Sequence, residues 1–286
     1  MLPVKVDVKL LKLLRNKTDL PYIDCKEALA QSNNNLDDAL RILKIKGLAK
    51  AEKKSINKTT EGITKVLING NDAVIAELNC QSEQVAVLSE FSSLLNNILA
   101  LILKNKPPTM AALLNLETAN KDLVINEIKM AIAKLGENIV LSRFQILTKA
   151  PNEVFGSYIH GGGKYAGLVV IAGVDEQSEV PSNMAMQAVV SETVKYIDID
   201  QIPSNIKDQQ LSILKAQVVS LNKPPQIIEK MLQGRMANFL SEITIINQQY
   251  IKDPLIKVKE YLVKNHATIK AMIRYQLGEN VDNFTN

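Results

Sequence analysis

The chain has no tryptophan, two cysteines, two histidines and few aromatic residues. Aromatic residues make up 4% of its 286 residues, so stacking on single-stranded bases is not expected. Cys25 and Cys80 form no CxxC pair, and His160 and His266 lie far apart in the sequence. These patterns exclude a disulfide framework, and they fit neither a thiolate nor a histidine metal site.

Long apolar runs and an excess of one charge are also missing. The longest apolar run, Ile98 to Leu103, is far shorter than the roughly 20 residues that cross a bilayer. Residues 1–17 alternate Lys with apolar residues and lack the features of a signal peptide. The net charge is only +4, with both signs interspersed. We therefore expect a cytoplasmic protein with no membrane partner and no direct nucleic-acid partner.

What the chain does contain is enough apolar material for packed cores. Hydrophobic residues make up 46% of the sequence, and 286 residues are more than one ordinary core serves. The periodic segments predict an α+β protein. The expected parts are a three-helix partner-binding module with its linker (1–54), the first half of a core (55–150), a second half (151–264) with a helical segment (181–222), and a C-terminal strand and tail (265–286).

The first module reads as three short helices. Val6, Leu10 and Leu14 recur at helical spacing, Asn35 is a predicted N-cap, and Gly47 is expected to end the third helix. A unit of this size has a thin core. Its leucines are either all core residues or in part a partner-binding patch, and the sequence leaves both interpretations open.

Two similar halves are predicted to follow. The first has strands at 62–68 and 73–78 around an Asn-Gly turn, helices at 85–104, 109–115 and 118–134, and a β-like segment at 139–147. The second has strands at 155–159 and 166–172 around a glycine turn, helices at 182–194, 207–221, 225–240 and 255–264, and a strand at 267–277. The repeated order of strand, turn, strand and helix indicates a duplication.

The glycine turn at 161–163 does not form a phosphate-binding loop. A Walker loop requires GxxxxGK[ST] and an immediate helix, whereas Tyr165 follows Lys164 here. His160 has no nucleophile motif around it, and Cys80 reads as a small buried hydrophobic residue. We therefore expect no enzyme activity, no cofactor and no metal.

The stretch Asn79 to Ala86 is the most informative part of the chain. It runs from the end of a predicted strand into a helix. Ser82 is a good N-cap and Glu83 a good first-turn carboxylate. A capped helix start is rigid, so it can present Glu83 and Gln84 to a partner in a fixed geometry.

Six motifs in the same order resemble the bacterial elongation factor Ts family. They are Leu14-Arg15 with Asp24-Cys25-Lys26, Asn79-Cys80 with Ser82 to Ala86, Gly136 to Ile139, Tyr158-Ile159-His160 with Gly167 to Val170, Lys223-Pro224 with Glu229 to Met231 and Gly234-Arg235, and Arg274 to Glu279. Together they span nearly the whole chain. The resemblance also implies a ubiquitin-associated-like fold for the three-helix module.

The resemblance implies a guanine-nucleotide exchange factor for elongation factor Tu that binds both its GDP-bound and its nucleotide-free form. In the family, a Thr-Asp-Phe-Val tetrad dislodges magnesium from elongation factor Tu, and Ser82, Glu83, Gln84 and Val85 stand in its place. The carboxylate is kept with one more methylene, but the aromatic ring is absent. Other implied contact residues are Leu14, Arg15, His160 and Gly161.

The missing ring leaves an alternative open. The chain could be a regulatory or structural protein of the same fold that binds elongation factor Tu with weak exchange activity. A homodimer is also left open, because residues 181–221 contain apolar helices that could pair.

Overall fold

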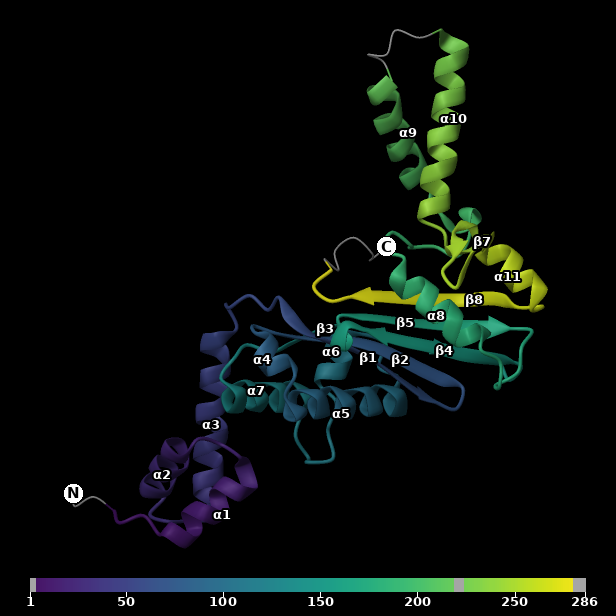
Figure 1. The fold of residues 1–286 in the computed structure, drawn as a ribbon. Coiled ribbons are helices and arrows are strands. Elements are labelled where there is room, and N and C mark those ends of the chain that lie inside the picture. The colour runs from purple at the N-terminus through teal and green to yellow at the C-terminus, as the bar shows by residue number, and fades with distance from the viewer. Residues whose placement is uncertain (1–3, 219–223, 280–286) are drawn as a thin grey trace. The chain divides into compact units, whose positions relative to one another are not determined.

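The structure, a computed structural model, describes residues 4–218 and 224–279. Helices and strands are mixed (Figure 1), which confirms the predicted α+β class. The chain divides into two compact units. Unit 1 holds the described parts of Met1–Leu67, Val74–Ile146 and Leu277–Asn286, and unit 2 holds those of Ile68–Ala73 and Leu147–Gln276. Within residues 4–218 and 224–279, no helix is both long and apolar enough to cross a membrane.

Unit 1 begins with the expected three-helix module. Its helices are α1 (Val8–Thr18), α2 (Tyr22–Gln31) and α3 (Leu36–Lys54). Asn35 caps α3 as predicted, since its Oδ1 accepts hydrogen bonds from the backbone N–H groups of Asp37 and Asp38 at 3.0 and 3.1 Å. The module's core consists of Leu11, Leu14, Leu20, Cys25, Ala28, Leu29, Ala39 and Leu43, with Ala133 of a later helix.

The prediction that Gly47 ends the third helix is wrong. Helix α3 continues to Lys54 and packs on α7 (Val124–Leu135). A Cβ atom at Gly47 would lie 2.8 Å from the Sδ atom of Met130 on α7. The glycine therefore allows two helices to approach closely, and it terminates neither of them.

The first sheet of unit 1 consists of β1 (Glu61–Asn69), β2 (Asp72–Cys80) and β3 (Val140–Thr148), in the order β1-β2-β3. The central strand β2 is almost wholly buried. Its helices are α4 (Glu83–Ala86), α5 (Ser89–Asn105), α6 (Met110–Leu114) and α7, and Figure 1 shows α5 and α7 along one face of the sheet. Phe91, Leu95 and Ile98 of α5 are buried in this core.

Two predicted helices in unit 1 need correction. The helix expected at 85–104 is interrupted after α4, because Leu88 has an extended backbone (ψ 141°) and α5 starts anew at Ser89. The helix expected at 118–134 begins only at Val124. Before it, Thr118 accepts from Lys121 in a turn, so these residues do not extend the helix.

Unit 2 contains the second sheet, formed by β4 (Glu153–His160), β5 (Tyr165–Ala172) and β8 (Thr268–Gln276) in the order β4-β5-β8. Both pairs are antiparallel, with Gly156 opposite Val169 and Val169 opposite Met272. Helix α8 (Val180–Val190) covers this sheet. A Cβ atom at Gly156 would collide with the carbonyl group of Pro181, so the glycine allows α8 to lie close to β4.

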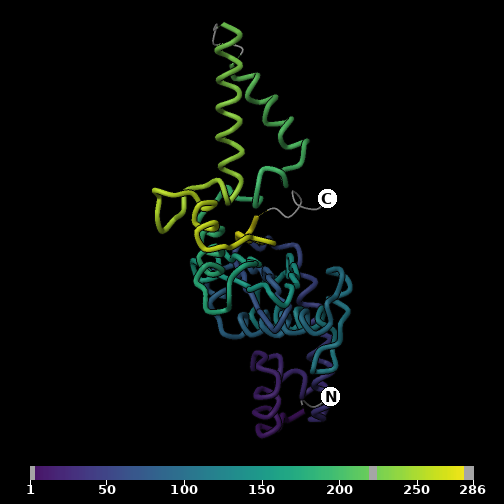
Figure 2. Tube along the Cα trace, turned by 90° about the vertical axis from the view of Figure 1, so that its right-hand side faces the viewer, coloured from purple at the N-terminus to yellow at the C-terminus, as the bar shows by residue number. Residues whose placement is uncertain are grey.

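The remaining elements of unit 2 are mostly helical. Helices α9 (Ser204–Val218) and α10 (Pro225–Glu242) contact each other, and Figure 2 shows them diverging along their length. Short 3₁₀ turns lie at Gly161–Gly163, Ile199–Gln201 and Ile245–Asn247. Strands β6 (Gln249–Tyr250) and β7 (Asp253–Lys257) form a small hairpin before α11 (Val258–Lys264).

Two predictions in unit 2 also need correction, and two lie outside the described residues. Helix α8 ends at Val190, earlier than the predicted 194. The helix expected from Leu255 begins at Val258, because the preceding residues pair with β6 instead. The predicted end of α9 at Leu221 and the tail from residue 280 lie outside the described residues.

The two sheets share one topology. In each, a hairpin is followed by helices, and a later strand then pairs with the second strand of the hairpin. The second strand is therefore the central and most buried strand in both. This order agrees with the duplication that the sequence indicates.

Candidate partner-binding segment

The segment Ser82–Val85 leaves the end of the central strand β2 and forms the start of α4. Ser82 has an extended backbone (φ −131°, ψ 152°), and its Oγ accepts a hydrogen bond from the backbone N–H of Val85 at 3.4 Å. This is the N-cap geometry that the sequence predicts. The direction of the segment is therefore set by the strand before it and the cap within it.

Exposure divides the four residues into two pairs. Glu83 and Gln84 are exposed, whereas Ser82 is half-buried and Val85 is 7% exposed within the core of unit 1. Val85 therefore holds the turn to the core, and the side chains available to a partner are those of Glu83 and Gln84. One turn later, Val87 is 76% exposed and adds an apolar side chain to the same segment.

A carboxylate from elsewhere in unit 1 holds this segment in place. Glu137 lies between α7 and β3, and its Oε2 accepts from the backbone N–H groups of Gln81 at 3.1 Å and Ser82 at 2.9 Å. Its Oε1 accepts from the Ser82 hydroxyl at 2.6 Å. Hydrogen bonds to an ionised acceptor are stronger than neutral ones. Three such bonds to one side chain fix the positions of Gln81 and Ser82.

The neighbouring residue Asn138 extends this anchor. Its backbone N–H donates to Oε1 of Gln81 at 3.0 Å, and its side-chain Nδ2 donates to the carbonyls of Ser55 at 3.3 Å and Asn57 at 2.8 Å. Asn138 is only 3% exposed, so these bonds satisfy a buried polar group. The end of α3 and the start of α4 are thus bound to the same short stretch.

Cys80, the last residue of β2, lies directly behind the segment. It is fully buried, and its thiol donates to the carbonyl of Ser82 at 3.2 Å. Burial, and then the negative charge of Glu137, raise the pKa of the Cys80 thiol to about 11. A thiol held neutral in this way is a poor nucleophile. The residue therefore acts as part of the packing.

The other predicted contact residues of unit 1, Leu14 and Arg15, differ in exposure to solvent. Leu14 is fully buried in the core of the three-helix module, so the interpretation of Leu14 as a surface contact is corrected. Arg15, next to it on α1, is exposed. Leu13, on the same helix, is 52% exposed. The surface of α1 that a partner could touch thus carries Leu13 and Arg15.

His160 and Gly161 lie in unit 2, at the turn between β4 and β5. Both are exposed, and Gly161 has a positive φ of 61° in the 3₁₀ turn. The Nδ1 atom of His160 lies 3.3 Å from the hydroxyl of Tyr158, and the imidazole ring is stacked with the Tyr158 ring at 6.1 Å between centroids. The turn is a hairpin connection, as predicted, and it presents the histidine at its edge.

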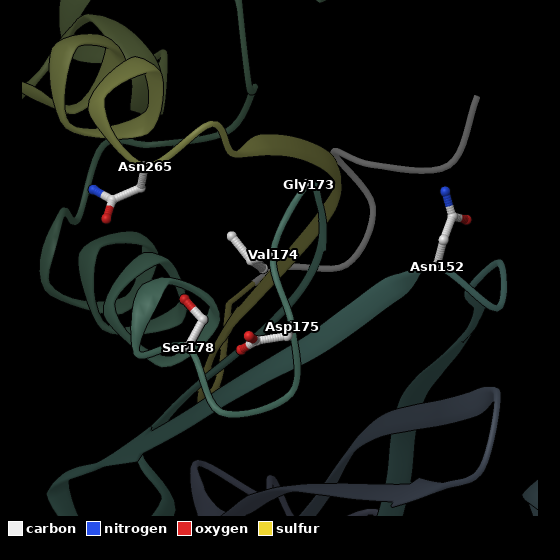
Figure 3. Close-up of a pocket in the computed structure, with 6 residues that line it drawn as sticks. All are labelled: Asn152, Gly173, Val174, Asp175, Ser178 and Asn265. Carbon is white, nitrogen blue, oxygen red and sulfur yellow. The ribbon is translucent and has the colours of Figure 1, made fainter.

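A pocket of about 540 Å³ also lies in unit 2 (Figure 3). Its lining residues are Asn152, Gly173, Val174, Asp175, Ser178 and Asn265. Asp175 accepts from the backbone N–H of Gln177, Ser178 accepts from that of Val180, and the Asn265 amide donates to the carbonyl of Tyr261. These six described residues include no nucleophile with a base beside it. Their polar groups serve the local turns.

The sequence motif identifies Ser82 to Val85 but not Glu137, the residue that holds the start of this segment. The sequence identifies Gly136 to Ile139 only as a family motif and predicts no contact for the side chain of Glu137. The hydrogen bonds from Gln81 and Ser82 to Glu137 span 56 and 55 positions of the sequence. No periodic pattern in the sequence reveals contacts over such a separation. The available signal was a charged residue directly after a helix-ending glycine, Gly136 (φ 79°).

The sequence also matches a known protein family. The family model described as "Elongation factor TS" matches residues 82–279. The matched range covers well over half of the chain and starts at the N-cap of the candidate segment, while residues 1–81 lie before it. The chain therefore belongs to the elongation factor Ts family and has a role in translation elongation.

Proposed function

We propose that the chain is a guanine-nucleotide exchange factor that promotes release of GDP from elongation factor Tu. The observation that carries this proposal is the anchored segment at the start of α4. It presents Glu83 and Gln84 to solvent, while Ser82 is held by two hydrogen bonds to Glu137 and Gln81 by a third. A rigid, exposed carboxylate is suited to disturbing the magnesium and phosphate site of a partner.

The mechanism needs no catalytic side chain in this chain. Elongation factor Tu would bind GDP well and this chain well, but both together poorly, and such coupling is reciprocal. An acceleration of GDP release by about 10⁴ through weakened affinity requires roughly 5.5 kcal/mol of differential binding. That exceeds what one side chain supplies, so several contacts must share it. Arg15 on α1 and His160 at the β4–β5 turn are the proposed additional contacts, toward both the GDP-bound and the nucleotide-free form.

A second candidate function follows from one residue. Gln84 is exposed where the family carries an aromatic ring, and a glutamine side chain buries less apolar area in a partner's pocket. On this alternative, the chain binds elongation factor Tu as a regulatory or structural partner and exchanges nucleotide weakly. The two proposals share the interface and differ only in the rate of GDP release.

The experiment that separates them is stopped-flow release of fluorescent GDP from the cognate elongation factor Tu. The exchange proposal expects release to accelerate by several orders of magnitude and to saturate with the concentration of this chain. Tight binding with an acceleration below about tenfold would favour the alternative. Absence of binding by calorimetry would refute both. Whether the chain forms a homodimer is answered in the same samples by sedimentation.

A further inference from the structure

We propose that Glu137 is a positioning residue for exchange, and that its carboxylate sets the geometry in which Glu83 meets the partner. This inference rests on the proposed exchange function. Glu137 is not itself one of the proposed contacts. It acts through the Ser82 backbone and hydroxyl, which it binds at 2.9 and 2.6 Å.

The first reason is the lack of strand partners where the segment begins. Strand β2 ends at Cys80, so the backbone N–H groups of Gln81 and Ser82 need acceptors outside it. Glu137 Oε2 accepts from both. Without this carboxylate neither N–H group has a hydrogen-bond acceptor among the contacts described, and the Ser82 hydroxyl keeps only the 3.4 Å cap to Val85.

The second reason is that Glu137 is itself held from both sides. Gly136 ends α7 in a left-handed conformation, and its carbonyl accepts from Lys54 Nζ at 2.6 Å. Ile139 is 2% exposed, and Asn138 is bonded to Ser55 and Asn57. The backbone of Glu137 is therefore held in place, so its carboxylate fixes the position of Ser82. Glu83 follows Ser82 directly, and its position is fixed in turn.

The third reason is that the contact depends on the length and the acceptors of this side chain. In Glu137→Gln, the amide oxygen can still accept from the two backbone N–H groups, and the amide NH₂ can donate to the Ser82 hydroxyl. In Glu137→Ala, all three bonds are lost. Comparing these two variants therefore separates the effect of losing the hydrogen bonds from the effect of losing the charge.

The test combines amide exchange of the isolated full chain with GDP release from elongation factor Tu. In Glu137→Ala we expect the amides of Gln81 and Ser82 to exchange at least about tenfold faster. We expect the rate of GDP release at saturating factor to fall at least about tenfold, with affinity for nucleotide-free elongation factor Tu changed less than about threefold. Glu137→Gln should stay within about threefold of wild type in each measurement.

The matched control is Glu127→Ala. Glu127 is a carboxylate on α7 that accepts from Thr118 and Asn120 in a different loop. Its loss should leave the amides of Gln81 and Ser82 and the release rate within about twofold of wild type.

Unchanged exchange of these amides in Glu137→Ala, or an equal fall in release rate in Glu127→Ala, would overturn the inference. A wild-type chain that does not accelerate GDP release would instead refute the proposed function and the functional half of the inference. Amide exchange would still test separately whether Glu137 holds the backbone of Gln81 and Ser82.

Discussion

The two sheets share a topology, but the loops that leave their central strands differ. After β2, only Gln81 and Ser82 precede α4. Both donate to Glu137, and the Gln81 side chain also accepts from the backbone N–H of Asn138; these partners lie more than fifty positions away. After β5, residues 173–179 precede α8, and the hydrogen bonds described for Asp175 and Ser178 are local. One loop is fixed by distant residues, whereas the other is a series of turns.

Of the two loops, the one held by distant residues is better suited to binding a partner. A short loop held by distant groups keeps its exposed side chains in one geometry, which a partner can use without a further cost of ordering. A longer loop with local bonds tolerates change more easily. The proposed contact segment lies on the first kind of loop, and the pocket of Figure 3 lies on the second.

The largest effect should come from removing the buried side chain of Asn138, which follows the carboxylate that holds the first loop. Asn138→Ala leaves the carbonyls of Ser55 and Asn57 without their Nδ2 donor, so we expect a loss of about 2–3 kcal/mol in the free energy of unfolding. Asn152→Ala, at an exposed residue before β4 that lines the pocket beside the second loop, should change it by less than about 0.5 kcal/mol. Urea unfolding measures both, and equal losses would contradict the greater structural importance of the stretch that follows α7.

The next effect concerns the carboxylate that the first loop presents. Glu83→Ala should slow GDP release at saturating factor by about 10- to 30-fold, or about 1.4–2 kcal/mol, because an interaction made at the partner's magnesium site is lost. Asp175→Ala removes an acidic side chain from the second loop and should leave release unchanged. Stopped-flow fluorescence gives both rates. A Glu83→Ala chain as fast as wild type would show that Glu83 does not act on the partner's magnesium site.

A smaller effect, in the opposite direction, is expected at the neighbouring position. Gln84→Phe places a ring on an exposed side of the turn, and its burial in an apolar partner pocket is worth roughly 1.5–3 kcal/mol. After the loss of the glutamine contacts, we expect release to accelerate by about tenfold. The thermal midpoint of the free chain should stay the same, since the position is exposed. A slower rate would mean that the partner has a polar contact matched to Gln84.

The smallest expected effect is on the pH dependence of stability, through Cys80 behind the first loop. Burial and Glu137 raise the pKa of its thiol from an ordinary value of 9.0 to about 11. The folded state therefore favours the neutral thiol. Its contribution to stability is complete below pH 9 and is lost as the pH rises through 11. Unfolding free energies between pH 8 and 11 should fall less steeply in Cys80→Ala than in wild type, and parallel curves would contradict this.

Much of the fold was predictable because it rests on local signals. The Asn-Gly turn and the glycine turn fixed both hairpins, Asn35 and Ser82 marked two helix starts, and the apolar strands gave the α+β class. Predictions failed where tertiary contacts decided. Gly47 predicts a helix end but makes room for Met130, and residues 255–257 predict a helix but belong to strand β7, which pairs with β6.

The candidate segment was predictable only in part. Ser82 to Val85 were located by their resemblance to a family motif, but the same reasoning made surface contacts of Leu14 and Val85, which the structure buries. A motif records which residues recur and does not say which of them face inward. Glu137 was missed because its contact joins residues more than fifty positions apart, and local spacing carries no information about such a pair.

The central claim is that Glu137 acts on exchange through the segment that carries Glu83. A double-mutant cycle on the rate of GDP release at saturating factor tests it most directly. If Glu137 only positions Glu83, the chain with both Glu83→Ala and Glu137→Ala should be no more than about twofold slower than the slower single variant. If the two losses multiply, so that the double variant is slower by the product of the single effects, the two residues act independently and the account is contradicted.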